Sequence, residues 1–337
     1  NLSENRNEAM QYYKGETAAI LALINRHETF MVTAHISADG DAYGAALATA
    51  YLLEKLGKKV EVIFSDVDID EKYRSLAGWE DIISWSSDLN REFDAAIAVD
   101  VSSRKRIGDA AALLPEADRC VMIDHHPKEE QFADTIMHDT AASSASRLVF
   151  ELVEAAGIEM DADLATLILT GIMFDTGRFA FSNTSSRDFE IAGKLIEAGA
   201  RPEKVSEFMM FNIPLISLKT IGYGLADLET RLNGKVGLIF LSKERIEVEE
   251  PLDIDPLASY SLSPRGAEVG IFIRETSELF KISLRSKGLI DVSAIAREIG
   301  GGGHKQAAGC RFEGEYNTLL ERLLNLIEQQ LQSVQRH

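Results

Sequence analysis

The sequence contains few cysteines and has no long apolar run. Its two cysteines, Cys120 and Cys310, lie far apart among 337 residues, and neither belongs to a CxxC or Cys/His cluster. This pattern excludes a disulfide framework or a thiolate metal site, and it is typical of reduced thiols in a cytoplasmic protein. The longest apolar stretch, residues 164–174, is too short to cross a bilayer, and residues 1–18 are too polar for a secretory signal. We therefore expect a cytoplasmic protein that does not enter a membrane.

Basic residues are also scarce. There are 35 lysines and arginines against 54 aspartates and glutamates, which gives a formal net charge of −19. A protein that binds duplex nucleic acid needs clustered basic residues to neutralise phosphates, so the composition argues against a duplex partner. A short nucleotide held in one local pocket is compatible with this charge, and bound cations could complete an acidic site.

Strand-like and helix-like segments alternate in the first half of the chain. This alternation predicts an α/β domain over residues 1–185, with a mostly parallel, doubly wound sheet covered on both faces. The predicted strands are residues 29–35, 59–64, 94–100 and 119–124, and the predicted helices are 41–57, 142–156 and 161–173.

The second half of the chain has a different pattern. Residues 186–230 carry helical patterns only and are predicted to form a connector. Residues 231–337 are predicted to form a smaller α/β domain with a mixed sheet, in which the turn ETSE joins two strands as a hairpin. Its predicted elements are strands at 235–241, 268–274, 279–285 and near 310, and helices at 291–299 and from about 315.

Acidic residues and histidines recur at the ends of the predicted strands of the first domain, and after the apolar run that precedes Asp175. Ligands of open α/β sheets bind outside the carboxyl ends of the strands, so these side chains are predicted to converge on one rim. They come from four segments of the chain: His35, Asp39, Asp41, Asp100, Asp124, His125, His126 and Asp175.

Each of these residues also has an ordinary structural interpretation. Asp41 could cap a helix, Asp175 could sit in a turn, and the helix opening at 142–146 could be plainly capped or bind an anion. Together, however, the carboxylates would repel one another unless cations lay between them. Oxygen and imidazole ligands without thiolate suit Mn²⁺, with Mg²⁺ as the alternative. The spacing of Asp39 and Asp41 suits two metals about 3.5–4 Å apart that share one bridging carboxylate.

Five motifs, in order, carry a family resemblance. They are HISADGDAYG from His35, AVDVS around Asp100, VMIDHH ending at His126, TGIMFDTGRF around Asp175, and GGGGHKQAAG from Gly300. Together they resemble the DHH phosphoesterase superfamily over nearly the whole chain. The nearest subgroup is the two-domain nanoRNase/pAp-phosphatase type, which acts as an oligoribonuclease and a 3′,5′-bisphosphate nucleotide phosphatase.

The resemblance implies roles for the rim residues. His35 and Asp39 would hold one of two Mn²⁺ ions, and Asp100 would bridge the pair. The second ion would be held by Asp41, His125 and Asp175.

The resemblance also implies catalytic roles for His126, which would face the phosphate, and for Asp124, which would support it. A water shared by the two metals would attack phosphorus in line. Whether His126 stabilises the phosphate or protonates the leaving oxygen is left open.

The resemblance implies that residues of the second domain bind the terminal nucleotide across an interdomain cleft. The Gly-rich segment by itself could also be only a flexible turn after the preceding helix. Glycines do let backbone N–H groups approach a phosphate, and a guanidinium can bind one bidentately. The residues concerned are Arg285, Gly301, Gly302, Gly303 and His304.

The sequence thus predicts a Mn²⁺-dependent phosphoesterase that degrades very short single-stranded RNA from an end and dephosphorylates pAp-like nucleotides. A homodimer is compatible with it. One alternative function is a phosphodiesterase of the same superfamily that hydrolyses cyclic di-AMP or its linear product. A manganese pyrophosphatase is disfavoured by the GGGH motif, and a processive RecJ-like exonuclease by the charge of −19. A metal-free nucleotide-binding module is the rival of another class, and the acidic rim argues against it.

Overall fold

The computed structural model describes residues 13–211, 213–246 and 252–334. The chain divides into two compact units, residues 1–212 and 213–337. The boundary falls inside the range predicted as a helical connector. Of the three helices in that range, α7 (Ser186–Glu197) and α8 (Pro202–Met210) belong to the first unit, and α9 (Leu215–Ala226) belongs to the second.

The first unit is built on a six-stranded, wholly parallel sheet with the order β3-β2-β1-β4-β5-β6. The predicted doubly wound sheet is therefore confirmed. Strand order reverses between β1 and β4, and open α/β sheets bind their ligands at such a point. The strands are β1 (Thr29–Thr33), β2 (Lys59–Phe64), β3 (Ile83–Ser84), β4 (Ala95–Val99), β5 (Cys120–Asp124) and β6 (Thr135–His138).

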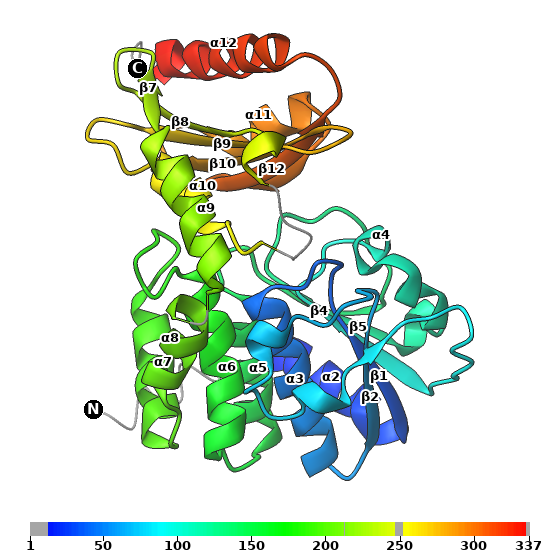
Figure 1. The fold of residues 1–337 in the computed structure, drawn as a ribbon. Coiled ribbons are helices and arrows are strands. Elements are labelled where there is room, and N and C mark those ends of the chain that lie inside the picture. The colour runs from blue at the N-terminus through cyan, green and yellow to red at the C-terminus, as the bar shows by residue number, and fades with distance from the viewer. Residues whose placement is uncertain (1–12, 212, 247–251, 335–337) are drawn as a thin grey trace. The chain divides into compact units, whose positions relative to one another are not determined.

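Helices cover both faces of this sheet (Figure 1). Alternate strand residues such as Phe30 and Val32 pack into one core, whereas Met31 and Met122 pack into another on the opposite face. Because both faces are buried, the strands are continuous apolar runs in the sequence. The helices are α2 (Lys14–Arg26), α3 (Gly40–Lys55), α4 (Arg104–Ile107), α5 (Ala145–Ala156) and α6 (Ala162–Asp175).

Side-chain caps define where helices α3 and α7 begin. Asp39 caps α3, because its carboxylate accepts hydrogen bonds from the backbone N–H groups of Asp41 and Ala42. Asp41 itself lies in the first turn of α3, so the capping role considered for Asp41 belongs to Asp39. Helix α7 begins after Ser185, whose capping box uses Asp188.

The second unit contains a mixed sheet with the order β11-β12-β10-β9-β8-β7. Strands β8 and β9 are parallel, and the other pairs are antiparallel, which includes the predicted β9–β10 hairpin. The strands are β7 (Glu229–Arg231), β8 (Val236–Leu241), β9 (Val269–Glu275), β10 (Phe280–Ser286), β11 (Gly302–His304) and β12 (Ala307–Phe312).

Two cores flank this second sheet. Helices α11 (Val292–Glu298) and α12 (Tyr316–Val334) pack on one face through Leu319, Leu323 and neighbouring residues. Helices α9 and α10 (Pro256–Ser261) contribute to a smaller core with Ile239 and Phe272. Figure 1 shows α12 lying along the sheet.

The end of the GGGH segment forms a strand, so the alternative that the whole segment is only a flexible turn is wrong. Gly302, Gly303 and His304 make up β11, which pairs with β12 at the edge of the sheet. Gly303 has a φ of 134°, which a residue with a side chain rarely adopts.

No single helix in the described parts of the chain is long and apolar enough to cross a membrane. Helices α8 and α9 have sufficient length and apolar composition only when they are taken together.

Candidate active site

The first unit gathers the rim residues at the carboxyl edge of its sheet. Three follow β1, one follows β4, and three lie at or just past the end of β5. Asp175 is the last residue of helix α6, so it arrives from a helix and not from a strand end. The set consists of His35, Asp39, Asp41, Asp100, Asp124, His125, His126 and Asp175.

Two groups of possible metal ligands meet at Asp100. In the first, His35 Nε2 lies 3.4 Å from Asp100 Oδ2 and 3.9 Å from Asp39 Oδ1. In the second, His125 Nε2 lies 3.0 Å from Asp175 Oδ2 and 3.8 Å from Asp41 Oδ2. His125 Nε2 is also 3.4 Å from Asp100 Oδ1. The two oxygens of Asp100 therefore face different groups, as a bridging carboxylate would require.

Backbone carbonyls orient the two imidazoles. His35 Nδ1 lies 2.9 Å from the carbonyl oxygen of Ile36, and His125 Nδ1 lies 3.3 Å from that of Ala142. Donation from Nδ1 leaves Nε2 as the nitrogen that can bind a cation, which is the usual arrangement of metal-binding histidines.

His126 has a carboxylate partner instead. Its Nδ1 lies 2.9 Å from Asp124 Oδ1 and 3.4 Å from Asp100 Oδ1. Asp124 is fully buried and His126 is partly exposed. Asp124 therefore holds the imidazole in one orientation, as the sequence interpretation expects of a supporting residue.

Asp41 is fixed by the start of helix α5. Its carboxylate accepts hydrogen bonds from the N–H groups of Ala145 (2.6 Å) and Ser146 (3.0 Å). The amino end of a helix favours negative charge. The anion considered for the helix opening at 142–146 is thus the chain's own carboxylate.

Asp100 has an unusual backbone conformation. Its φ is 55°, in the left-handed region that aspartate tolerates better than most residues with a side chain. Its N–H donates to the carbonyl of Ile123 on the neighbouring strand β5, at 2.9 Å. The chain therefore turns sharply just after β4, at the position where the carboxylate lies between the two groups.

The charges of this cluster need a counter-charge. Burial, together with the neighbouring Asp100 carboxylate, raises the pKa of Asp39 to about 6. Burial, Asp100 and Asp175 raise the pKa of Asp41 well above its usual value. Burial by itself would lower the pKa of His35, but its hydrogen bond to Asp100 raises it to about 10. Carboxylates that are buried and mutually repelling are stabilised by a divalent cation, so the donor set fits Mn²⁺ or Mg²⁺.

A polar network behind the site, in which Ser143 and Asp188 are buried, has no counterpart among the predicted site residues. Asn183 Nδ2 donates to the backbone carbonyls of Asp175 (3.1 Å) and Ser143 (3.2 Å). Asp188 accepts from the Ser143 hydroxyl and from the Ser185 N–H, the latter at 2.7 Å. The Ser185-x-x-Asp188 spacing is a capping-box signal that could have been recognised. The contacts to Ser143 leave no local signal.

The second unit aligns the residues predicted to bind substrate. Arg285 on β10 pairs with Ala307 on β12, which pairs with His304 on β11. Directly paired residues project to the same face of a sheet, so Arg285 and His304 flank the small side chain of Ala307. Burial lowers the pKa of Arg285, while Asp255 acts in the opposite direction.

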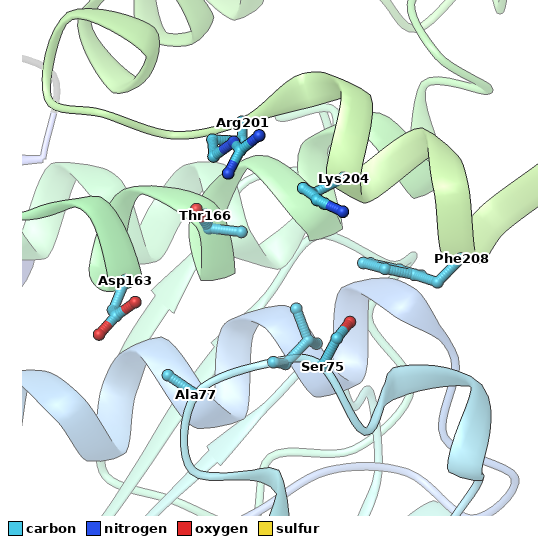
Figure 2. A pocket seen from close by; sticks show the side chains of 8 residues that line it. Ser75, Ala77, Asp163, Thr166, Arg201, Lys204 and Phe208 are labelled. Atoms are coloured by element: carbon cyan, nitrogen blue, oxygen red, sulfur yellow. The ribbon is translucent and has the colours of Figure 1, made fainter.

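A separate pocket lies away from this chemistry (Figure 2). It measures about 190 Å³ and is formed by the loop at Ser75, helix α6 and helix α8. Its cations are already paired, Arg201 with Glu203 and Lys204 with Glu207. The pocket lies at the amino end of α6, about 18 Å along the helix from the end that carries Asp175. We therefore do not include it in the active site.

Comparisons with known proteins agree with this fold. The model of the DHH family N-terminal domain matches residues 29–172, and that of the DHHA1 domain matches residues 244–333. The chain therefore belongs to the DHH family and is a phosphoesterase of that family.

Individual relatives cover most of the chain. A bifunctional oligoribonuclease and PAP phosphatase NrnA of Thermus thermophilus is 27% identical over 303 residues, 89% of each chain. An uncharacterised MG371 homologue of Mycoplasma pneumoniae is 31% identical, covering 83% of this chain and 85% of its own. The crystal structure of an exopolyphosphatase-related protein from Bacteroides fragilis matches with a TM-score of 0.87 and 25% identity, over 96% of this chain and 98% of its own.

Proposed function

We propose that this phosphoesterase uses two divalent cations to remove nucleotides from an end of very short RNA and to dephosphorylate pAp-like 3′,5′-bisphosphate nucleotides. The observation that carries the proposal is the position of Asp100, which contacts both histidine–carboxylate groups. The Thermus thermophilus relative, named for these two activities, supports the choice of substrates.

The distances support one ligand set for each cation. One cation would be held by His35, Asp39 and Asp100, and the other by Asp41, Asp100, His125 and Asp175. When bound, such a pair neutralises charge on a phosphoryl oxygen and lowers the pKa of a bound water. The oxygen-rich donor set with imidazole favours Mn²⁺.

The chain's own residues orient the reacting groups. The Nδ1–H of His126 is directed to Asp124, so Nε2 is the nitrogen that would face a phosphate oxygen or the leaving oxygen. Asp124 acts through His126 and is a positioning residue in this proposal. A fixed imidazole does not have to reorient during the reaction, which is how preorganised groups assist catalysis.

The second unit would recognise the substrate. The Arg285 guanidinium is largely buried, and burial makes its charge costly. A phosphate bound bidentately would offset that cost. Gly301, Gly302 and Gly303 would let backbone groups approach the same phosphate, next to His304.

Replacing Arg285 tests this recognition. We expect Arg285→Gln to raise KM for pAp and for pApA by roughly 10- to 100-fold, because a hydrogen bond to a charged group contributes about 1.5–3 kcal/mol. Steady-state kinetics with Mn²⁺ provide the measurement. Arg265→Gln, which removes an exposed arginine of the same unit, is the matched control and should leave KM unchanged. An unaltered KM in the Arg285 variant would remove this residue from the proposal.

A hydrolysis panel tests the function itself. Purified protein with Mn²⁺ is expected to release mononucleotide from pApA and phosphate from pAp, and excess EDTA should abolish both reactions until Mn²⁺ is restored. Longer RNA, cyclic di-AMP and pyrophosphate complete the panel. Faster turnover of cyclic di-AMP than of pApA and pAp would favour the phosphodiesterase rival. Activity that persists in EDTA would contradict the role of cations.

A further inference from the structure

One face of the second sheet carries a row of cations. Arg274 on β9, Lys281 on β10 and Arg311 on β12 are direct cross-strand partners. Their side chains therefore project to the same face of three adjacent strands. We call Arg274, Lys281 and Arg311 the cationic row. Figure 1 shows the three strands side by side.

The same face also carries the predicted phosphate contact. Arg285 lies four residues beyond Lys281 on β10, about 13 Å along the strand. Ser283 lies between them, and its paired residue on β12 is Gly309. Lys281, Gly309 and Arg311 are exposed, so this part of the face is open. Along β10 and β12, the surface between Arg285 and the cationic row is therefore formed by small residues.

Carboxylates do not balance this face. The residues that β9, β10, β11 and β12 project to it include no aspartate or glutamate. Within the described parts of the chain, none of the three cations has an ion-pair partner within 4.0 Å. Arg274 Nε is buried and, among the described residues, has no hydrogen-bond partner. Glu275, the last residue of β9, projects to the opposite face and accepts a hydrogen bond from the Lys243 N–H.

Such a row costs stability. Like charges that are directly opposite on neighbouring strands repel each other. The chain as a whole has a net charge of −19, so a local group of cations without carboxylates departs from its composition. A polyanion that crosses all three strands would remove the repulsion and could accept a hydrogen bond from Arg274 Nε, which has no partner among the described residues.

We propose that the cationic row binds the phosphate backbone of single-stranded RNA beyond the nucleotide held at Arg285. The inference rests on the proposed function, because it extends the same substrate along the same face. Phe272 on this face is buried in the smaller core, and the exposed part carries no aromatic side chain. Contacts would therefore be to phosphates and insensitive to base sequence. RNA of several nucleotides would reach the row, and a dinucleotide or pAp would not.

An equilibrium binding assay tests the proposal without depending on catalysis. The full chain is titrated into a 5′-labelled RNA heptamer and into labelled pApA, in EDTA, at 50–200 mM salt, and anisotropy is recorded. For the double variant Lys281→Gln/Arg311→Gln, we expect heptamer affinity to fall about tenfold more than pApA affinity. The slope of log affinity against log salt should decrease by roughly 1.4, about 0.7 for each phosphate that is no longer neutralised.

The controls separate binding from folding. The double variant Arg265→Gln/Arg322→Gln removes two exposed arginines elsewhere in the same unit and should bind both probes like the wild type. The melting temperature of Lys281→Gln/Arg311→Gln should not be lower than that of the wild type, because like-charge neighbours are removed.

Three results would overturn the proposal. The first is wild-type heptamer affinity in the Lys281→Gln/Arg311→Gln variant. The second is an equal loss for both probes, which would place the row at the terminal nucleotide. The third is equally strong competition by polyglutamate, which would indicate an acidic protein partner. Failure of the hydrolysis panel alone would leave the binding result standing, so the two proposals can fail separately.

Discussion

Replacement of Asp100 by asparagine is expected to reduce phosphoester hydrolysis by about a thousandfold or more. The side chain keeps its shape, but the charge between the two histidine–carboxylate groups is removed. Because Asp100 contacts both groups, neither cation would keep its full ligand set. A bound cation contributes several kcal/mol of transition-state stabilisation, and each 1.4 kcal/mol corresponds to about tenfold in rate.

The measurement for Asp100→Asn is kcat/KM with pApA, together with calorimetric titration of Mn²⁺. Two Mn²⁺ should bind the wild-type protein, and the variant should bind them at least tenfold more weakly. Asp94→Asn is the matched control, because Asp94 lies just before the other end of β4, where its carboxylate accepts hydrogen bonds from the backbone N–H groups of Glu28 and Thr29. Undiminished Mn²⁺-dependent activity in Asp100→Asn would refute the assignment of Asp100 as the bridging ligand.

The second large effect is expected at Gly171, in the middle of helix α6. A Cβ atom placed there would clash with Asp41 Oδ1 and Ser146 Oγ, well inside van der Waals contact. Asp41 cannot retreat easily, because two N–H groups of α5 hold its carboxylate. Gly171→Ala should therefore cost about 1–3 kcal/mol of unfolding free energy, the range typical of overpacking, and should also displace a metal ligand.

Urea unfolding and Mn²⁺ titration would measure both consequences of Gly171→Ala. Gly193→Ala provides the control, because Gly193 lies inside helix α7 and an added Cβ would meet nothing within 4 Å. That change should stabilise the protein by about 0.5–1 kcal/mol through helix propensity. If Gly171→Ala had the same stability and metal affinity as Gly193→Ala, the prediction that a Cβ atom at position 171 displaces Asp41 would be wrong.

The fold of the first unit is largely predictable from the sequence, because a parallel sheet buried on both faces leaves continuous apolar strands. Strand β6 and helix α2 are not predicted in this way; β6 is short and only partly buried. The sequence of β11 is equally typical of a turn, since glycine is rare in strands and only the pairing with β12 stabilises this one.

The rim residues can be predicted from the sequence, because acidic residues and histidines recur at the ends of the predicted strands and helices of the first domain. The residues that support them cannot. Asn183 and Ser143 act through a contact across about 40 positions of the chain, and Gly171 matters because of an empty space next to Asp41. A hydrogen bond between residues far apart in the chain produces no periodic pattern in the sequence. A position that has no space for a side chain produces none either.

The hydrogen bonds of Asp41 have a consequence for how this site can change during evolution. Asp41 is constrained twice, as a proposed cation ligand and as the acceptor for two N–H groups at the start of α5. Asp39 and Asp175 are less buried than Asp41. A descendant that lost catalysis would therefore be freer to vary at Asp175 than at Asp41. If such a descendant kept an acidic residue at position 41 but lost the other predicted ligands, that residue could be kept for its hydrogen bonds to α5. It would not be evidence that the protein is still active.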